Sequence, residues 1–162
     1  MNWQFLNVFK NETYDIRRAQ SDWGDSHSAV TNTDGPMGFQ FLSKGSIKVL
    51  DRNGDFYREY SAGEQLTAPA DAPPWAMEKV ILLSKERTDY FCIKSSIAPM
   101  DTITGTFHTL TAGSTFTSTN ENFLIAYGKL ENAGRVLPSR EVLLDNSNTY
   151  SVVEDSMVVV FE

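Results

Sequence analysis

The stretch from Phe39 to Met77 constrains the fold most, because short apolar segments alternate in it with glycines, a tight turn and prolines (FQFLSKGSIKVLDRNGDFYREYSAGEQLTAPADAPPWAM). Apolar and polar side chains alternate in Ser46–Asp51, which is typical of a half-buried strand. Asn53-Gly54 suits the positive φ angles of a type I′ hairpin turn, so Phe56–Tyr60 is predicted as the returning strand. Prolines exclude a helix or a central strand from the corner that follows (Pro69, Pro73 and Pro74). The stretch therefore predicts short strands joined by tight turns.

The same pattern continues to the C-terminus. Further strands are predicted at Gln65–Ala68, Lys79–Ser84, Thr88–Lys94, Thr106–Leu110, Phe123–Tyr127, Lys129–Glu131, Arg140–Leu144, Thr149–Val153 and Met157–Phe161. Strands that begin about 8–12 residues apart are typical of an all-β sandwich or barrel. Helical periodicity is absent except for a single turn over Tyr14–Gln20.

Residues 1–38 are the least regular part of the chain. Trp3 and Phe5 belong to an apolar segment that could dock as an edge strand or a short helix. From Tyr14 to Gly38 the sequence is rich in Ser, Asp, Asn and Gly, which predicts a long polar loop. We therefore expect an N-terminal arm and loop (1–38) followed by two halves (39–98 and 99–162), or alternatively one compact domain.

An internal repeat is a second hypothesis. When Gly45 is aligned with Gly128, Phe41-Leu42 falls on Leu124-Ile125 and Gly63 on Asn146. Gly and Asn both tolerate positive φ, so the aligned positions can share a backbone conformation. Two meandering β segments can also overlay by chance, and the sequence leaves both explanations open.

Two segments resemble the motifs of the cupin superfamily. LTAGSTFTSTNENFLIAYGKL (110–130) is similar to the first cupin motif, and SAGEQLTAPADAPPWAM (61–77) is similar to the second. The resemblance covers about residues 39–162 and implies a jelly-roll barrel. It also implies a metal site built from two His and a Glu of the first motif and a third His of the second.

The metal ligands of that pattern are missing. The first motif offers Thr117, Ser118, Thr119, Asn120, Glu121 and Asn122, and Trp75 stands near the place of the last His. Hydroxyls and amides are poor ligands for Fe, Mn or Zn, so neither a metal nor another cofactor is expected. Some metal-free cupin-like sugar epimerases use a His–Asp dyad and a Tyr. Asp25 and His27, with Tyr60 or Tyr127, would be the counterparts here.

Composition excludes several classes of function. The formal charge of −7 and the scattered cations argue against a nucleic-acid partner. The N-terminus lacks the pattern of a signal peptide, and no apolar run is long enough to span a membrane. The single cysteine, Cys92, is predicted to be a buried thiol in a reducing compartment. We expect a protein of the cytoplasm or of a virion.

Individual aromatic residues suggest binding surfaces. Trp75 could cover one end of a barrel and stack on a sugar or base, with Tyr60, Tyr127 and His108 as further ligand-binding candidates. A His that alternates with Phe107, as His108 does, is more often a core residue than a catalytic one. Interface anchors are predicted at Trp3, Phe5 and Trp23. No residue is predicted to be catalytic, because the sequence contains no GxSxG, P-loop, HExxH or CxxC motif.

Three functions remain open. The first is a non-enzymatic structural or protein-interaction protein, such as a phage virion component, that self-associates through its sheet faces and N-terminal arm. The second is a small-ligand-binding cupin relative that holds a sugar or a nucleotide. The third is a metal-free sugar isomerase or epimerase.

Overall fold

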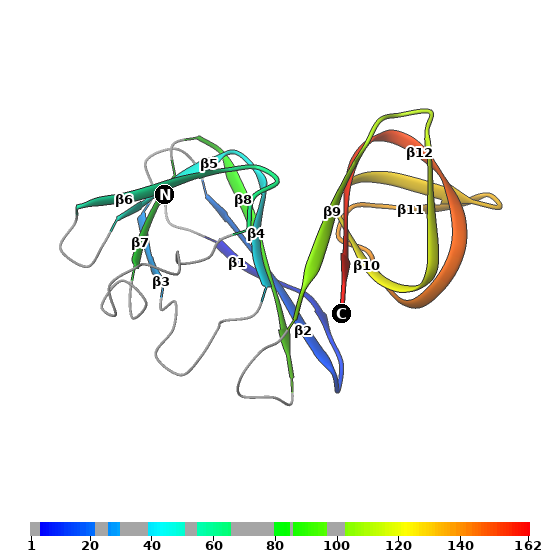
Figure 1. Cartoon of the computed structure of the whole chain (residues 1–162), viewed down its shortest axis with the longest axis horizontal. Helices are drawn as coiled ribbons and strands as arrows, with labels where there is room; N and C mark the ends of the chain where they lie inside the picture. The colour runs from blue at the N-terminus through cyan, green and yellow to red at the C-terminus, as the bar shows by residue number, and fades with distance from the viewer. Residues whose placement is uncertain are drawn as a thin grey trace. The chain divides into compact units, whose positions relative to one another are not determined.

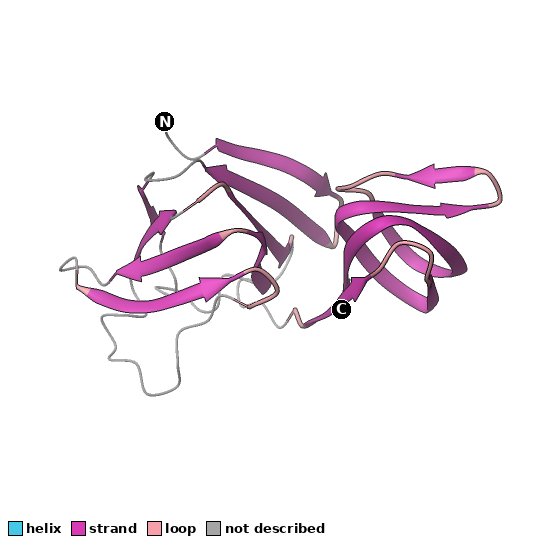
Figure 2. Cartoon of the chain, turned by 90° about the horizontal axis from the view of Figure 1, so that it is seen from above, coloured by secondary structure: helices cyan, strands magenta, loops and turns pink. Residues whose placement is uncertain are grey.

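A computed structural model describes residues 4–21, 26–29, 39–50, 55–65, 80–84, 86–96 and 103–162. Every regular element in these ranges is a β-strand (Figure 2), which confirms the all-β prediction. The chain forms two compact units, Met1–Thr102 and Ile103–Glu162. The finer division into an arm and two halves stays a prediction.

The first unit contains two four-stranded sheets (Figure 1). One has the order β1-β2-β8-β4, with β1 at Gln4–Lys10, β2 at Tyr14–Ser21, β8 at Thr88–Ser95 and β4 at Phe39–Lys44. The other has the order β3-β7-β5-β6, with β3 at Ser26–Ala29, β7 at Val80–Ser84, β5 at Ser46–Leu50 and β6 at Phe56–Ser61.

The polar loop predicted from Tyr14 to Gly38 is wrong at Tyr14–Ser21 and at Ser26–Ala29, which are strands β2 and β3, and the helical turn predicted over Tyr14–Gln20 is wrong as well. Tyr14–Ser21 is strand β2, and it pairs antiparallel with β1 on one side and β8 on the other. Ile16 and Ala19 are buried within it. The polar residues of this segment have little strand propensity of their own. Pairing with the strands on both sides therefore decides its structure, and tertiary context overrides the local propensity. β1 lies at one edge of this sheet, so an edge strand, one of the two alternatives predicted for this segment, is confirmed.

Phenylalanine rings fill the core beside this sheet. Phe41 stacks on Phe91 with ring centroids 5.3 Å apart, and Phe39 lies 5.6 Å from Phe41. In the sheet register, Ile16 lies opposite Ile93 and Ile93 opposite Phe39. All five side chains are at most 2% exposed, so they form a continuous apolar layer.

The second unit is one four-stranded sheet of order β11-β10-β12-β9. Its strands are β9 at Gly105–Leu110, β10 at Thr115–Asn132, β11 at Arg135–Leu137 and β12 at Val142–Phe161. Figure 1 shows β10 and β12 curling together. The prediction of separate short strands is wrong here, because left-handed residues within β10 and β12 bend each strand without ending it (Asn120, Gly128 and Asp145).

The inside of this curl is packed with apolar side chains. Phe116, Phe123 and Tyr150 make edge-to-face contacts with ring centroids 5.2 and 5.8 Å apart. Aliphatic residues complete the buried cluster (Ile125, Leu130, Leu137, Val152 and Val158). The interior of the second unit is therefore a core and not an open chamber.

Each unit contains the same local contact between a glycine and a hydroxyl residue. Gly45 has φ +78° and faces Thr88, and Gly128 has φ +98° and faces Ser156. Both hydroxyls are fully buried, and each donates to the carbonyl two residues before it. At the second aligned pair, Gly63 has positive φ, but in the other unit the left-handed residue is Asp145 and not Asn146. The internal repeat itself stays a prediction.

Several predicted features fall outside the described residues. These are the Asn53-Gly54 turn, the proline corner, most of the strand at Gln65–Ala68, and the three tryptophans Trp3, Trp23 and Trp75. Cys92 is only half-buried on β8, which corrects the prediction of a buried thiol.

Candidate functional site

A surface pocket of about 410 Å³ opens on the second unit. It is lined by Thr104, Gly105, Thr106, Asn120, Glu121, Asn122, Asp145, Val160, Phe161 and Glu162. Its volume lies in the range of small-molecule sites, about 300–1,000 Å³. The lining comes from β9, β10, β12 and the residues flanking β9 and β12, so one sheet positions the whole pocket.

One wall is built where β10 changes its pairing segment on β12. Glu121 lies opposite Asn146, whereas the next residue, Asn122, lies opposite Phe161. Asn120 and Asp145 adopt φ angles of 50° and 48°, in the left-handed region that Asn and Asp tolerate better than most residues. This local sequence of short polar residues therefore permits the bend that opens the pocket.

Hydrogen bonds hold this wall in place. The Asp145 amide donates to Asn122 Oδ1 at 2.9 Å, and the Asn120 amide donates to Ser147 Oγ at 2.7 Å. Below them, Asn146 Oδ1 accepts from Ser118 Oγ at 2.6 Å and from the Tyr150 hydroxyl at 3.0 Å. The bend is thus tied to the aromatic core and its shape is set before a ligand arrives.

A second wall is formed by the pairing of β9 with the end of β12. Thr106 lies opposite Val160 and Gly105 opposite Phe161. Beyond the strands, the Thr104 and Glu162 backbones exchange hydrogen bonds of 3.0 and 3.1 Å. The hydrogen bonds of both walls therefore fix the shape of this recess in the second unit.

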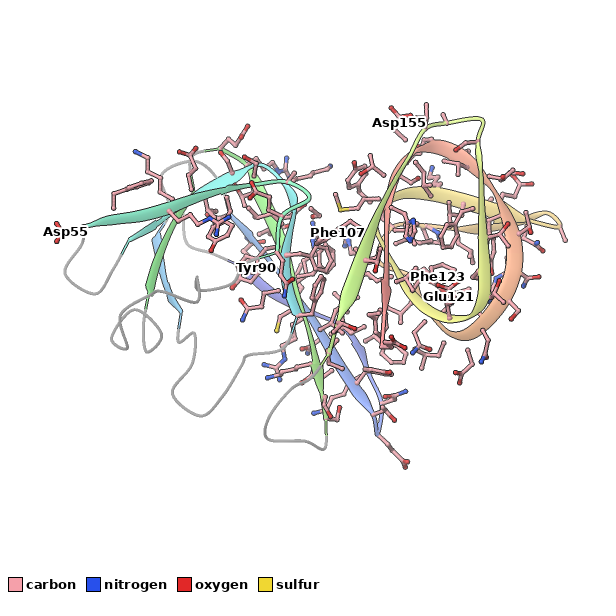
Figure 3. The ribbon with its side chains drawn as sticks, in the orientation of Figure 1. Asp55, Tyr90, Phe107, Glu121, Phe123 and Asp155 are labelled. Atoms are coloured by element: carbon pink, nitrogen blue, oxygen red, sulfur yellow. The ribbon has the colours of Figure 1, made fainter. Side chains whose placement is uncertain are left out.

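The lining is acidic. Three of its lining residues are acidic, Glu121, Asp145 and Glu162, and none is Lys or Arg. Glu121 Oε1 accepts a hydrogen bond from the Thr119 amide at 2.9 Å, which fixes the orientation of that carboxylate. Glu121 and the buried Phe123 both belong to β10 (Figure 3). Such a lining favours ligands that donate hydrogen bonds or carry positive charge, and it repels anions.

The predicted ligand-binding residues do not line this pocket. His108 and Tyr127 lie on β9 and β10 of the same unit, and the His108 ring packs 5.7 Å from that of Phe116. Tyr60 belongs to the first unit, where it is buried and carries the Arg58 guanidinium 4.7 Å above its ring. Phe5 lies on the edge strand β1. The roles predicted for these residues stay predictions.

The sequence identified part of the pocket. Asn120, Glu121 and Asn122 belong to the segment that resembles the first cupin motif, although they were considered there only as metal ligands. Asp145 and Glu162 were missed, because their approach to Glu121 depends on how β12 pairs with β10 and β9. The polar residues DNSN (145–148) between apolar strand segments were the available signal.

The donor set does not fit the metal that the cupin resemblance implies. Residues 117–122 supply one carboxylate and no imidazole, whereas first-row metals prefer three or four nitrogen, sulfur or carboxylate donors. Within the described part of the chain, no three His, Cys, Asp or Glu side chains gather closely enough to hold a metal.

The described residues include no helix long and apolar enough to cross a membrane.

Solved structures with similar folds include a cupin-type barrel protein and a protein of unknown function. A cupin 2 conserved barrel domain protein from Leptotrichia buccalis gives a TM-score of 0.53 at 9% identity, over 98% of this chain and 88% of its own. A conserved protein of unknown function from Pseudomonas aeruginosa gives 0.58 at 11% identity, over 99% and 87%. HutD from Pseudomonas fluorescens gives 0.52 at 12% identity, over 91% and 78%.

No family model matches this sequence, and no curated protein matches it. The structural likeness establishes a cupin-type, jelly-roll fold, as the sequence resemblance predicted. Structural likeness at sequence identities of 9–12% shows the fold but not the function. The function must therefore be argued from the residues of the pocket.

Proposed function

We propose that this cupin-type protein binds a small, uncharged ligand rich in hydroxyl groups, such as a sugar, in the pocket of its second unit. The observation that carries the proposal is the acidic, amide-rich lining of a recess of about 410 Å³. Carboxylate oxygens accept hydrogen bonds from hydroxyls, and Asn side chains can both donate and accept. Val160 and Phe161 add apolar surface for the carbon skeleton.

The acidic lining favours a sugar over a nucleotide, the two ligand classes considered from the sequence. A nucleotide would bring phosphate groups close to Glu121, Asp145 and Glu162, and like charges in a partly enclosed site repel each other. A neutral sugar has no such penalty. The likeness to cupin-type folds supports small-ligand binding in general. Of the predicted epimerase dyad, His27 lies on β3 and Asp25 lies outside the described residues.

Thermal unfolding tests the proposal. The midpoint of the full-length protein is measured with a panel of neutral monosaccharides and polyols, with their phosphorylated counterparts, and with nucleotides. At a concentration of 100 times its dissociation constant, a bound sugar stabilises the folded state by about 2.7 kcal/mol. We expect at least one neutral sugar to raise the midpoint and the phosphorylated form of that sugar to have no effect.

Two variants assign the effect to the pocket. Glu121→Gln and Asp145→Asn each remove a charge while keeping a similar shape, and Asn tolerates the left-handed φ of position 145. Either variant should weaken the sugar response. Asp155→Asn is the matched control, because Asp155 is an exposed carboxylate of the same unit outside the pocket lining. A panel without any response, or a stronger response to phosphorylated ligands, would contradict the proposal.

A further inference from the structure

Two buried hydroxyl groups support the pocket of the second unit without lining it. Ser118 on β10 and Tyr150 on β12 are each 3% exposed, and neither is among the lining residues. Both donate to one acceptor, Asn146 Oδ1, at 2.6 Å from Ser118 Oγ and at 3.0 Å from the Tyr150 hydroxyl. One partner satisfies a buried hydroxyl, and here two of them hold the same amide oxygen.

The two donors belong to the packed core of the unit. Ser118 Oγ accepts a hydrogen bond from the Asn148 amide at 3.2 Å, and it lies closer to Asn146 Oδ1 than to the Asn148 carbonyl oxygen, at 3.4 Å. The Tyr150 ring packs edge-to-face on the fully buried Phe123 ring. Packing and hydrogen bonds therefore restrict both hydroxyls, and through them the Asn146 side chain.

Asn146 lies between two residues that shape the polar wall of the pocket. Before it, Asp145 lines the pocket with φ 48°, and its amide donates to Asn122 Oδ1 at 2.9 Å. After it, Ser147 Oγ accepts from the amide of Asn120, another lining residue, at 2.7 Å. Peptide units are planar, so a rotation of the chain at Asn146 moves both of these contacts together.

We propose that the Tyr150 hydroxyl is a positioning group for ligand binding. Through Asn146 it holds Asp145 in the orientation in which the Asp145 carboxylate accepts a hydrogen bond from a ligand hydroxyl. The role rests on the sugar site proposed above and adds to it a determinant of affinity that does not touch the ligand. Binding geometry must be held to within about 0.5 Å, so a loosened Asn146 weakens binding although the lining residues are unchanged.

Tyr150→Phe tests this role, because it removes one oxygen and keeps the ring. The full-length wild type and the variant are titrated with glucose, galactose and mannose by calorimetry, well below the unfolding midpoint, so that lost stability alone cannot imitate lost affinity. We expect the sugar that binds the wild type to bind the variant about three- to tenfold more weakly. The NMR resonances of the Asp145 and Asn120 amides should also move in the ligand-free variant.

Thr149→Val is the matched control, since it removes a hydroxyl from the neighbouring residue, whose Oγ1 bonds to Thr117 Oγ1 on the exposed side of the strands. It should bind sugar like the wild type. Ser118→Ala removes the other hydrogen bond to Asn146 and should weaken binding as well, whereas Ser118→Thr keeps the hydroxyl and should restore it. This pair decides the question even if Tyr150→Phe does not fold.

The outcomes separate the positioning role from the sugar site itself. If the wild type binds a sugar and both Tyr150→Phe and Ser118→Ala bind it equally well, the positioning role is wrong and the sugar site stands. Unmoved Asp145 and Asn120 amides, or an equal loss of affinity in Thr149→Val, would also overturn the role. If none of the three sugars binds the wild type, the sugar site fails and the positioning role fails with it.

Discussion

Among single residues, Tyr90 shows most clearly how position changes chemistry. It lies on β8 with 7% of its surface exposed. Burial raises the pKa of Tyr90 well above its ordinary value, and the charge of nearby Cys92 raises it further. The neutral phenol is the form that the fold accommodates. Neither the cysteine nor the tyrosine is distinctive in the sequence TDYFCIK, and only the fold shows that Tyr90 is buried.

This shift predicts an alkaline loss of stability. Below about pH 10 Tyr90 is protonated in both the folded and the unfolded chain, whereas above it only the unfolded chain readily releases the proton. Stability should therefore fall as the pH rises above about 10. Tyr90→Phe should make the free energy of unfolding, measured by urea denaturation, less dependent on pH between about 9 and 11.

Cys92→Ala serves as the comparison for that experiment. Because burial is the larger cause of the shift, this variant should keep most of the wild-type pH dependence. If Tyr90→Phe loses stability with rising pH as steeply as the wild type, the shifted tyrosine is not the source of the effect.

At the scale of elements, the long strands β10 and β12 depend on a close contact at their bend. A Cβ atom at Gly128 would lie 2.5 Å from Ser156 Cβ and 2.6 Å from its Cα, and Gly128 has φ +98°. Ser156 is fully buried, and its Oγ accepts a hydrogen bond from the Lys129 amide at 3.1 Å. The bend therefore has room for a glycine only.

Gly128→Ala should destabilise the protein strongly. Positive φ costs an alanine about 1–2 kcal/mol, and the forced separation of β10 from Ser156 adds about 1–3 kcal/mol. Gly113→Ala is the matched control, because Gly113 has φ +89° with nothing within 4 Å of the added Cβ. Urea denaturation should show a distinctly larger loss for Gly128→Ala, and equal losses would rule out the close contact as the cause.

The sequence predicted the elements unevenly, for physical reasons. Ser46–Leu50 and Thr88–Ser95 were recognisable because β-branched and aromatic residues alternate or gather in them. The strand at Tyr14–Ser21 was not, because its backbone pairs with β1 and with β8, and β8 lies far away in the sequence. The continuity of β10 was hidden as well, since Asn120 and Gly128 are usual turn residues that here only bend a strand.

At the scale of the whole molecule, each unit has a core of its own. Phe91 is fully buried in the Met1–Thr102 unit, and Phe123 is fully buried in the Ile103–Glu162 unit. The rings that contact each of them come from the same unit. A change in one core should therefore be felt first in the unit that contains it.

Hydrogen exchange detected by mass spectrometry can measure this independence. Removing a buried Phe ring costs about 3–5 kcal/mol. We expect Phe123→Ala to reduce amide protection mainly in residues 103–162, and Phe91→Ala to reduce it mainly in the described strands of residues 4–96. An equal loss of protection throughout the chain for both variants would show that the two units unfold as one.

By itself the sequence determined the all-β class, the cupin-type resemblance and the misfit of the first-motif donors to a metal. These features follow from local alternation, turn residues and residue types. Only the tertiary structure decided which polar residues meet. Glu121, Asp145 and Glu162 line one pocket because β10 changes its pairing segment on β12, and Arg18 meets Asp89 because β2 pairs with β8. Both arrangements depend on strand pairings between distant segments, and local sequence does not encode such pairings.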